Sequence, residues 1–519
     1  MGLALATPLR RRIPPPALTL AGAACAAVVA VPLVYLAIVI GDHPDAAWEA
    51  LWRERTARLI GRSLLLAAAV SLSASVLALT LAWLTVRTDL PGRRLWSVLV
   101  VLPFVIPSYI GAYLFVSALG PGGVIAQTSW IFGFWGAWLV LTLFTYPLVL
   151  LPVRAALRRL DPALEEAARG MGRRPFVVFA TVVVPQLIPA LGAGALLAIA
   201  YSLADFGAVS ILRFDSFTRV IYQSYKASFD RTGAAALAAL LVVVIVLVVI
   251  AERRIRGDRG RTRVSPGVAR AATPVALGRW TVPALLFCGL VVAVALVIPV
   301  ATLIVWSGRA FAGDPDWGRL LAAAGRSLAT AGLAAGAAVL VALPIALLSA
   351  RHPGRISRVL DTVAQTGYVL PGLVVALALV FVGTRVAPWA YQTLGIVVFA
   401  LVVHFLPLAL GSMRTALLQV PRSVEEAGRN AGRGPLAVWA TITAPLAMGG
   451  TLAGAALVFL TTVKELPTLI LLAPTGYETL ATRIWSQSTV SAFEAGALPA
   501  LLLLAVSAPP LFLLAAKER

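Results

Sequence analysis

One stretch of the 519-residue sequence occurs twice: residues 165–185 read EEAARGMGRRPFVVFATVVVP, and residues 425–445 read EEAGRNAGRGPLAVWATITAP. The glycines Gly172 and Gly432 are 260 residues apart, and the glutamates and the final proline keep the same offset. Polar residues repeated at constant spacing in an otherwise apolar chain indicate a duplication. The rest of the fold can be worked out from these two copies.

The composition indicates a membrane protein. Hydrophobic residues make up 60% of the chain and charged residues only 13%. Apolar runs of about 20 residues are long enough to cross a bilayer as helices. We therefore predict an all-α integral membrane protein with about 12 transmembrane helices. The predicted spans are, with approximate limits, 17–40, 60–86, 96–119, 130–153, 182–204, 234–251, 280–305, 325–349, 359–383, 393–413, 445–463 and 496–515.

The formal net charge of +21 is explained by an excess of Lys and Arg in the loops assigned to the cytoplasm. If both termini are cytoplasmic, the loops assigned to the cytoplasm hold about 29 of the 43 Lys and Arg residues, as the positive-inside rule requires. No soluble basic domain is present to bind nucleic acid, so we expect no nucleic-acid partner. Membrane lipid is the expected surrounding.

The two copies also predict how the spans are arranged. If both copies lie on the cytoplasmic side, an even number of spans separates them, and six fit between them. This gives two parallel six-helix repeats rather than an inverted pair. We predict a first half over residues 1–255, a basic cytoplasmic linker over 256–279 and a second half over 280–519. The arginines of the linker could contact anionic lipid.

Each copy predicts a short capped helix, over residues 161–175 and 421–435. Asp161 and Pro162 are suited to a helix start, and Arg169 follows at a spacing that allows ion pairs with the glutamates. The glycine of each copy can end the helix in a left-handed turn. A capped amphipathic loop without any partner is the simpler interpretation. It does not explain why two copies keep their Glu, Gly and Pro spacing while the apolar residues between them differ.

The pattern E-A-A-x-x-x-G-x9-[IV]-x-x-P resembles the cytoplasmic signature of permease subunits of ATP-binding-cassette (ABC) importers. The second copy departs from it at Gly428, which replaces the second Ala, and at Ala444, which replaces the usual Leu. The resemblance implies the type I ABC importer transmembrane-domain fold in a bacterial cytoplasmic (inner) membrane. It also implies that each helix docks on an ATPase subunit. The residues expected to serve ATPase-subunit coupling are Glu165, Glu166, Ala167, Arg169, Gly172, Glu425, Glu426, Ala427, Arg429 and Gly432.

The sequence lacks a nucleotide-binding motif. Its three lysines are Lys226, Lys464 and Lys517, and none follows a glycine, so a G-x-x-x-x-G-K-[ST] phosphate loop is absent. We therefore expect a transport subunit rather than an enzyme, with no cofactor of its own. The resemblance implies two copies of an ABC ATPase subunit that bind ATP and Mg, and an extracytoplasmic (periplasmic) substrate-binding protein.

Two further stretches look like the ferric-iron branch of these permeases, whose members are commonly fused twelve-span chains. They are the V-K-E-L-P run at 463–467 and the D-F-G-A-V-S run at 205–210. The resemblance implies ferric iron as the cargo. Thiamine, phosphonate and polyamine permeases are relatives, so these cargoes stay open, and an ion-coupled secondary transporter is a more distant alternative. A membrane-embedded enzyme would require clustered acidic or His residues at a membrane face, which we do not find.

Charges near the ends of the fifth and eleventh predicted spans are candidates for the translocation pathway. Such charges are costly in a membrane unless they line a wet cavity or pair locally. The alternative is that they are ordinary charges at the outer ends of spans. Two separated carboxylates do not make a closed iron site, and isolated His404 is expected to pack or form a local hydrogen bond, so no resident metal is predicted. The pathway candidates are Asp205, Phe206, Lys464, Glu465 and Pro467.

Overall fold

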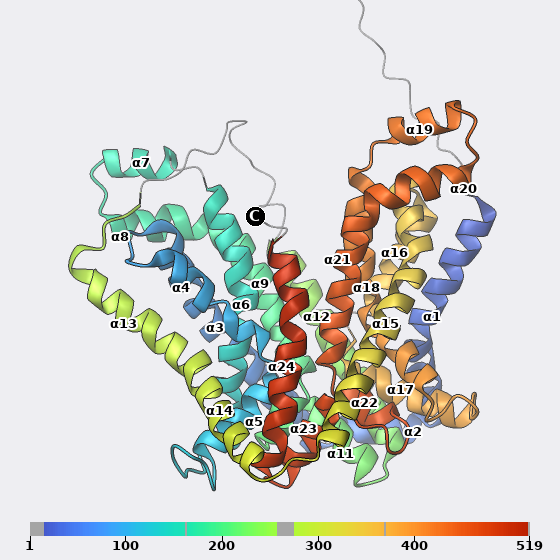
Figure 1. Cartoon of the computed structure of the whole chain (residues 1–519), viewed down its shortest axis with the longest axis horizontal. Coiled ribbons are helices and arrows are strands. Elements are labelled where there is room, and N and C mark those ends of the chain that lie inside the picture. Colours follow the sequence, from blue (N-terminus) through green and yellow to red (C-terminus); the bar gives the residue numbers. More distant parts are fainter. Residues whose placement is uncertain (1–14, 161–162, 257–273, 368–369, 517–519) are drawn as a thin grey trace, which may run out of the picture. The chain divides into compact units, whose positions relative to one another are not determined.

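The structure is a computed structural model that describes residues 15–160, 163–256, 274–367 and 370–516. Within these residues the regular structure is helical, apart from one isolated β-bridge between Thr88 and Val275 (Figure 1). The all-α prediction is confirmed. Most of the predicted linker, residues 257–273, lies outside the described residues.

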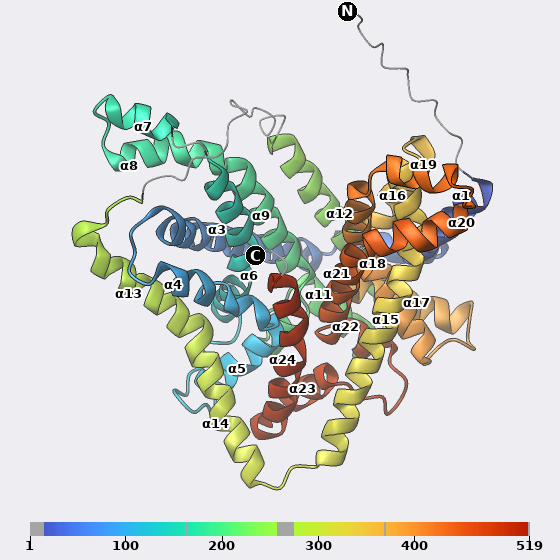
Figure 2. The same ribbon diagram turned by 45° about the horizontal axis from the view of Figure 1, so that its top comes forward.

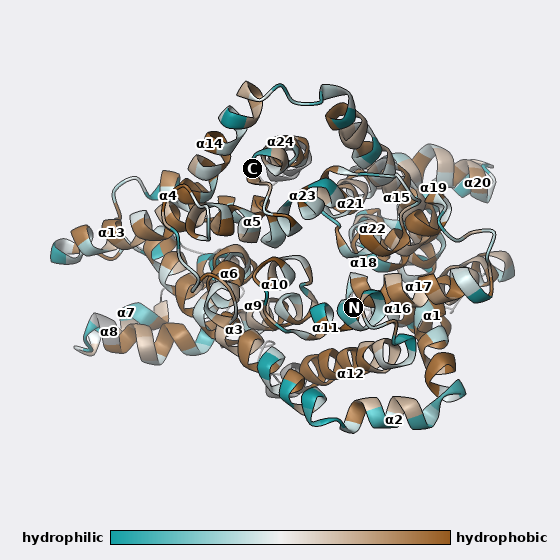
Figure 3. Ribbon diagram, turned by 90° about the horizontal axis from the view of Figure 1, so that it is seen from below, coloured by the Kyte–Doolittle hydropathy of each residue, from teal (hydrophilic) through white to brown (hydrophobic). Residues whose placement is uncertain are grey.

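Nine helices in the described part of the chain are long and apolar enough to cross a membrane, and each overlaps one of the predicted spans. A pair of helices bent by 94°, Arg93–Val105 with Ser108–Leu119, can make a tenth span. Helices such as α12 (Arg231–Arg256) and α13 (Thr281–Val292) are apolar along most of their length (Figure 3). Such helices are typical of a multi-pass membrane protein.

The third and ninth predicted spans are broken helices. Proline lacks an amide hydrogen and disfavours the helical conformation in the residue before it. Ile106 is accordingly extended (φ −81°, ψ 116°), and α5 (Ser108–Leu119) begins after Pro107. In the same way α17 (Gly372–Arg385) begins after Pro371. A continuous apolar run in the sequence conceals both breaks.

The duplication is visible in the order of the helices. Each α-helix from α3 to α12 has its counterpart twelve labels later, from α15 to α24. The correspondence includes two short π-helical turns, η2 (Phe179–Val183) and η6 (Trp439–Thr443), which are 260 residues apart. The prediction of two repeats is confirmed.

The helices group into two compact units that do not follow the two sequence halves. The predicted limits of the two halves, 1–255 and 280–519, describe the sequence repeat. The two compact units are defined by contacts, so they do not test those limits. Unit 1 takes its described residues from Met1–Ile38, Leu321–Thr479 and Val506–Arg519, and unit 2 is formed by Val39–Leu320 and Leu480–Ala505.

In unit 1, α18 packs along α21, and α17 packs against α22. Yellow to orange ribbons mark most of this unit in Figure 1. Its helices are α1 (Pro16–Asp42), α15 (Trp317–Arg351), α16 (Arg355–Thr366), α17, α18 (Leu394–Gln419), α19 (Arg422–Asn430), α20 (Pro435–Val438), η6, α21 (Ala444–Val463) and α22 (Pro467–Leu472).

In unit 2, α3, α6 and α9 pack against one another (Figure 2). Polar side chains add ties across these contacts: Ser71 Oγ donates to the carbonyl oxygen of Ala195 at 3.1 Å, and Trp138 Nε1 donates to Ser73 Oγ at 3.0 Å. The helices of unit 2 are α2 (Pro44–Trp52), α3 (Glu54–Arg87), α4 (Arg93–Leu99), η1 (Leu102–Val105), α5, α6 (Phe134–Arg159), α7 (Ala163–Gly170), α8 (Pro175–Val178), η2, α9 (Val184–Ala204), α10 (Gly207–Ile211), α11 (Phe217–Lys226), α12, η4 (Gly278–Trp280), α13, η5 (Ala293–Val297), α14 (Ile298–Ala312), α23 (Leu480–Thr489) and most of α24 (Phe493–Ala516).

One glycine in each unit lets two helices approach closely. A Cβ atom at Gly194 in α9 would lie 2.6 Å from Cα of Val149 in α6. A Cβ atom at Gly454 in α21 would lie 3.2 Å from Cα of Ala409 in α18. Between helices in lipid there is no hydrophobic driving force. Small residues at such crossings allow close van der Waals packing, which holds the helices together instead.

The substitution Gly194→Ala should destabilise unit 2, because the new methyl group meets backbone that cannot rotate away. We expect a cost of about 1–3 kcal/mol, seen as a lower thermal midpoint of the detergent-solubilised protein. Gly289→Ala in α13 is the matched control, since nothing lies within 4 Å of a Cβ atom there. Equal effects of the two substitutions would contradict the proposed close crossing.

Candidate functional site

The two repeated stretches form short helices outside the spans. α7 follows α6 and leads through α8 and η2 into α9; α19 follows α18 and leads through α20 and η6 into α21. In Figure 1, α7 lies beside α8 and α19 lies beside α20. The predicted helix start at Asp161 and Pro162 falls outside the described residues. In the second copy Pro421 directly precedes the helix.

Both helices end in the predicted left-handed glycine turn. Gly172 has φ +79° and Gly432 has φ +82°. The amide of Arg173 donates to the carbonyl oxygen of Ala168 at 3.3 Å, and the amide of Gly172 donates to that of Arg169 at 2.9 Å; the second copy repeats both bonds at 3.2 and 2.9 Å. This is the Schellman arrangement, which satisfies the last helical carbonyls and reverses the chain sharply.

The first glutamate of each copy is buried and holds its helix to the end of a spanning helix. Glu165, 4% exposed, accepts from Arg87, the last residue of α3. Glu425, 5% exposed, accepts from Nε and Nη2 of Arg351, the last residue of α15, at 2.9 and 2.6 Å. In an ion pair this well shielded from water, loss of one partner is much more costly than in a surface pair, because the remaining charge stays buried without compensation.

Further bonds complete the two ion pairs. Arg169 Nη2 lies 3.5 Å from a Glu165 carboxylate oxygen, and Arg429 Nη2 lies at the same distance from Glu425. Thr443 Oγ1 also donates to Glu425 at 3.0 Å. The predicted ion pairs between each helical arginine and a glutamate four residues earlier are therefore present.

The two adjacent glutamates of each copy differ in their exposure: the first is buried and the second is exposed. Glu166 and Glu426 are exposed, as are Ala167 and Ala427, whereas the first glutamates face the chain's own arginines. Sequence reasoning missed Arg87 and Arg351 as partners. The available signal was that each lies just after a predicted span and just before a Pro-Gly-Arg sequence, at 91–93 and 353–355.

The departure at Gly428 has a local physical reason. A Cβ atom at Gly428 would lie 2.6 Å from Cδ1 of Ile442 in η6. The first copy has Ala168 and Val182 at these two positions. Compared with the first copy, the second copy therefore has one methyl group fewer in the short helix, at Gly428, and one more in the π-helical turn, at Ile442. The total volume of the pair is conserved, which is how well-packed contacts tolerate substitution.

In unit 2, the pathway candidate Asp205 lies at the turn between α9 and α10. Its Oδ1 atom accepts from the amides of Ala208 and Val209 at 3.0 and 3.2 Å, and its Oδ2 atom accepts from the hydroxyl of Ser108. Phe206 is buried against the rings of Tyr222 and Trp485, at centroid distances of 4.9 and 5.1 Å. These contacts place both residues within the packing of unit 2.

In unit 1, the remaining candidates lie at the equivalent turn between α21 and α22. Pro467 is the first residue of α22, and Lys464 follows the last residue of α21. Glu465 Oε1 accepts from the amide and the hydroxyl of Thr468 at 3.3 and 2.8 Å. Lys464 and Glu465 are both partly exposed. The structure thus gathers the five candidates at two corresponding turns, one in each unit.

The last part of the predicted linker, after the residues that the structure does not describe, is hydrogen-bonded to the end of α3. The amide of Val275 donates to the carbonyl oxygen of Arg87 at 2.8 Å, and the amide of Asp89 donates to that of Val275 at 3.2 Å. Asp89 Oδ1 accepts from the amide of Leu277 at 2.9 Å. The residue that holds Glu165 is therefore also held by the chain that enters α13.

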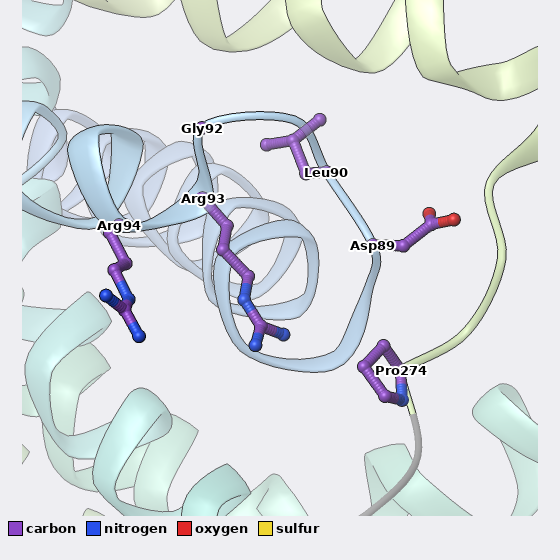
Figure 4. Close-up of a pocket in the computed structure, with 6 residues that line it drawn as sticks. All are labelled: Asp89, Leu90, Gly92, Arg93, Arg94 and Pro274. Carbon is purple, nitrogen blue, oxygen red and sulfur yellow. The ribbon is translucent and has the colours of Figure 1, made fainter.

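An open pocket of about 490 Å³ adjoins this tie. Figure 4 shows Arg93 and Arg94 extending to one side of the α3–α4 turn and Asp89 to the other. The pocket is lined by Asp89, Leu90, Gly92, Arg93, Arg94 and Pro274. Among the described residues, no group of three or more His, Cys, Asp or Glu side chains is arranged to hold a metal ion.

Comparison with known proteins assigns the family. The sequence profile described as "Binding-protein-dependent transport system inner membrane component" matches residues 74–257 and 342–517. The chain is 31% identical over 470 residues to "Fe(3+)-transport system permease protein FbpB 2" of Haemophilus influenzae, covering 90% of this chain and 91% of that protein.

Two other relatives match smaller parts of the chain. "Molybdenum transport system permease protein ModB" of Escherichia coli K12 is 35% identical over 134 residues, covering 24% of this chain and 58% of the relative. "Sulfate transport system permease protein CysT" of Escherichia coli K12 is 33% identical over 170 residues, covering 31% and 61%. All three relatives are named as transport permeases, so the resemblance to transport permeases is confirmed.

Breaking the pair of Arg351 and Glu425 should loosen α19. Either Arg351→Gln or Glu425→Gln leaves a buried charge without its partner, at a cost of about 3–5 kcal/mol, and the double variant should lose less than the sum. Hydrogen–deuterium exchange in α19 and the thermal midpoint measure the effect. The exposed pair of Arg53 and Glu49 is the control, where loss of the pair should cost no more than about 1 kcal/mol. Additive single effects at the buried pair would contradict the direct coupling.

The pair of Gly428 and Ile442 should also show coupling. Gly428→Ala alone gains helix propensity but overlaps with Ile442, so its net effect should be small. In a protein that already carries Ile442→Val, which makes room for a methyl group, Gly428→Ala should raise the free energy of unfolding by about 1 kcal/mol relative to Ile442→Val alone. Thermal midpoints of the four proteins measure this. An equal effect of Gly428→Ala in both backgrounds would show that the two positions do not interact.

Proposed function

The chain belongs to the binding-protein-dependent transport system inner membrane components, and from this premise we propose that it carries ferric iron across the membrane. It is a multi-pass permease subunit and not an enzyme. The observation that supports ferric iron is the match over 90% of the chain to a permease named for Fe(3+). The relatives named for molybdenum and sulfate align with less than a third of it.

The proposed partners follow from the duplication. Two ABC ATPase subunits would each receive one of the two short helices, and ATP and Mg would bind to them and not to this chain. An extracytoplasmic binding protein would deliver the cargo. Both short helices would then lie in the cytoplasm. Two segments on the same side of a membrane must be separated by an even number of spans, and this placement agrees with cytoplasmic termini. Residues 1–255 and 280–519 would be the two permease halves, joined by the basic segment 256–279.

Force transmission is the role that we propose for the repeated stretches. α7 is tied by Glu165 to the end of α3 and continues through its glycine turn into α8 and α9. A push on α7 would therefore act on two spanning helices together, and α19 is tied in the same way through Glu425. The exposed Glu166 and Glu426 would face the ATPase subunits, while the buried glutamates would keep each helix attached.

Transport would proceed by alternating access. Closure of the ATPase subunits moves the two short helices, the spanning helices change their arrangement, and the cargo crosses from the outside to the cytoplasm. Because the ion pairs behind α7 and α19 are buried, each short helix would move as one body with the helix end that holds it. The translocation pathway would involve the turns that carry Asp205 and Glu465.

Uptake of ferric iron by reconstituted vesicles tests this function. The chain, its ATPase subunit and its binding protein should together take up radioactive ferric iron only when ATP is present on the ATPase side. Uptake driven by an ion gradient without the ATPase subunit would contradict the ABC mechanism. ATP-dependent uptake of molybdate or sulfate, with no uptake of iron, would contradict the cargo.

The double variant Glu166→Ala and Glu426→Ala tests the coupling helices. Loss of two exposed interface carboxylates should reduce ATP-driven uptake by about tenfold or more, because residues at the centre of an interface each contribute on the order of 1–2 kcal/mol. The thermal midpoint of the permease alone should stay unchanged. Glu478→Ala, another exposed glutamate, is the matched control. Unchanged uptake and ATPase binding in the double variant would refute the coupling role.

A further inference from the structure

The two repeats use their corresponding acidic residues differently. Asp205 and Glu465 are 260 residues apart and lie at equivalent turns. Both oxygens of Asp205 are engaged, by two backbone amides and by the hydroxyl of Ser108. Glu465 uses only Oε1, which accepts from Thr468; in the described residues no hydrogen bond reaches its Oε2 atom. Among the described residues, the carboxylate in unit 1 is thus held by fewer hydrogen bonds than its counterpart in unit 2.

An imidazole faces the same point as this carboxylate. A Cβ atom at Gly372, the first residue of α17, would lie 2.6 Å from Glu465 Oε1 and 3.5 Å from Nε2 of His404. The absence of a side chain at Gly372 therefore lets the Glu465 carboxylate and the His404 ring both lie close to this position.

The hydrogen bond on the other ring nitrogen orients the imidazole. Nδ1 of His404 lies 3.3 Å from the carbonyl oxygen of Gly367. A carbonyl oxygen can only accept, so Nδ1 is the protonated nitrogen in this bond, and Nε2 is the nitrogen that lies near Gly372. Histidines that bind metals are commonly held in this way, with the second nitrogen donating to a backbone carbonyl.

Unit 2 lacks this arrangement. The position equivalent to His404 is Phe144, whose ring fills the space over Gly111. The position equivalent to Gly372 is Ser108, since each is the first residue of its helix after a proline. The Ser108 hydroxyl donates a hydrogen bond to the Asp205 carboxylate. The two copies therefore differ in the side chains around the carboxylate: only in unit 1 does an imidazole lie near the same glycine as the carboxylate.

The location of His404 separates this arrangement from an ordinary interfacial charge. His404 lies near the middle of the 26-residue helix α18, one of the membrane spans. Since the Glu465 carboxylate and the His404 ring both lie close to Gly372, this carboxylate is also far from both ends of α18. Ionisable groups at such depth are costly and are retained where they serve transport.

We propose that Glu465 and His404 form a transient contact site for the metal cation that this permease carries. One carboxylate oxygen and one imidazole nitrogen are donors that iron accepts. Two donors cannot close a coordination sphere, so the cation keeps its other ligands and is released again, as passage requires. The inference rests on the proposed ferric-iron function and assigns the contact to unit 1, while Asp205 holds α10 and α5 together in unit 2.

The test uses the complete importer, reconstituted with its ATPase subunit and binding protein. Glu465→Gln keeps the bond to Thr468 but removes the charge, and His404→Phe installs the residue of the other repeat. Each should lower ferric-iron uptake by about tenfold, and the double variant should be no worse than about the stronger single one, since the two residues act as a unit. His404→Gln replaces His404→Phe if the phenyl ring impairs folding.

Two comparisons separate a contact with cargo from a structural role. Glu478→Gln, an exposed carboxylate of the same unit, should leave uptake unchanged. Asp205→Asn should lower the thermal midpoint, whereas Glu465→Gln and His404→Phe should not. A fall in midpoint for the Glu465 variant that equals the fall for the Asp205 variant would show a packing role and overturn the proposal.

The remaining outcomes distinguish this inference from the function on which it rests. Uptake at the wild-type rate by the Glu465 and His404 variants would overturn the contact site and leave ferric-iron transport standing. Absence of iron uptake by the wild-type importer, with both partners present, would contradict the proposed function and the contact site with it.

Discussion

The buried ion pair between a spanning-helix arginine and the first glutamate of each repeated stretch is the constraint on which the arrangement depends. Arg87 with Glu165, and Arg351 with Glu425, connect a short surface helix to the end of a long apolar one. Removing either charge leaves the other buried without compensation, which is far more costly than losing a surface pair. The short helix can therefore be exposed on one side and still be firmly attached on the other.

Much of this architecture follows from the sequence because periodic signals carry it. Apolar runs located the spans, and the constant offset of Gly172 and Gly432 identified two repeats and their glycine turns. The helix breaks at Pro107 and Pro371 were not predicted, because hydropathy sums over a window and ignores a single missing amide hydrogen.

The candidate site was only partly accessible from the sequence. The acidic residues of the repeat could be found, but their hydrogen bonds depend on contacts that are distant along the chain, such as that of Asp205 with Ser108. Likewise, the sequence shows Gly428 as a departure from a pattern, and only the proximity of Ile442 explains it. Local spacing identifies which residues are repeated; tertiary packing determines which of their atoms remain available.

The break before α5 also has a consequence for how the chain enters a membrane during synthesis. A helix of 12 residues is about 18 Å long, shorter than the roughly 30 Å of a bilayer core. Its polar ends would be exposed to lipid if it were inserted alone. α5 packs against α10, which emerges from the ribosome much later. α5 also packs against α6, which follows it directly, so only part of its packing surface depends on the later α10, and for that part the order of synthesis and the order of burial differ.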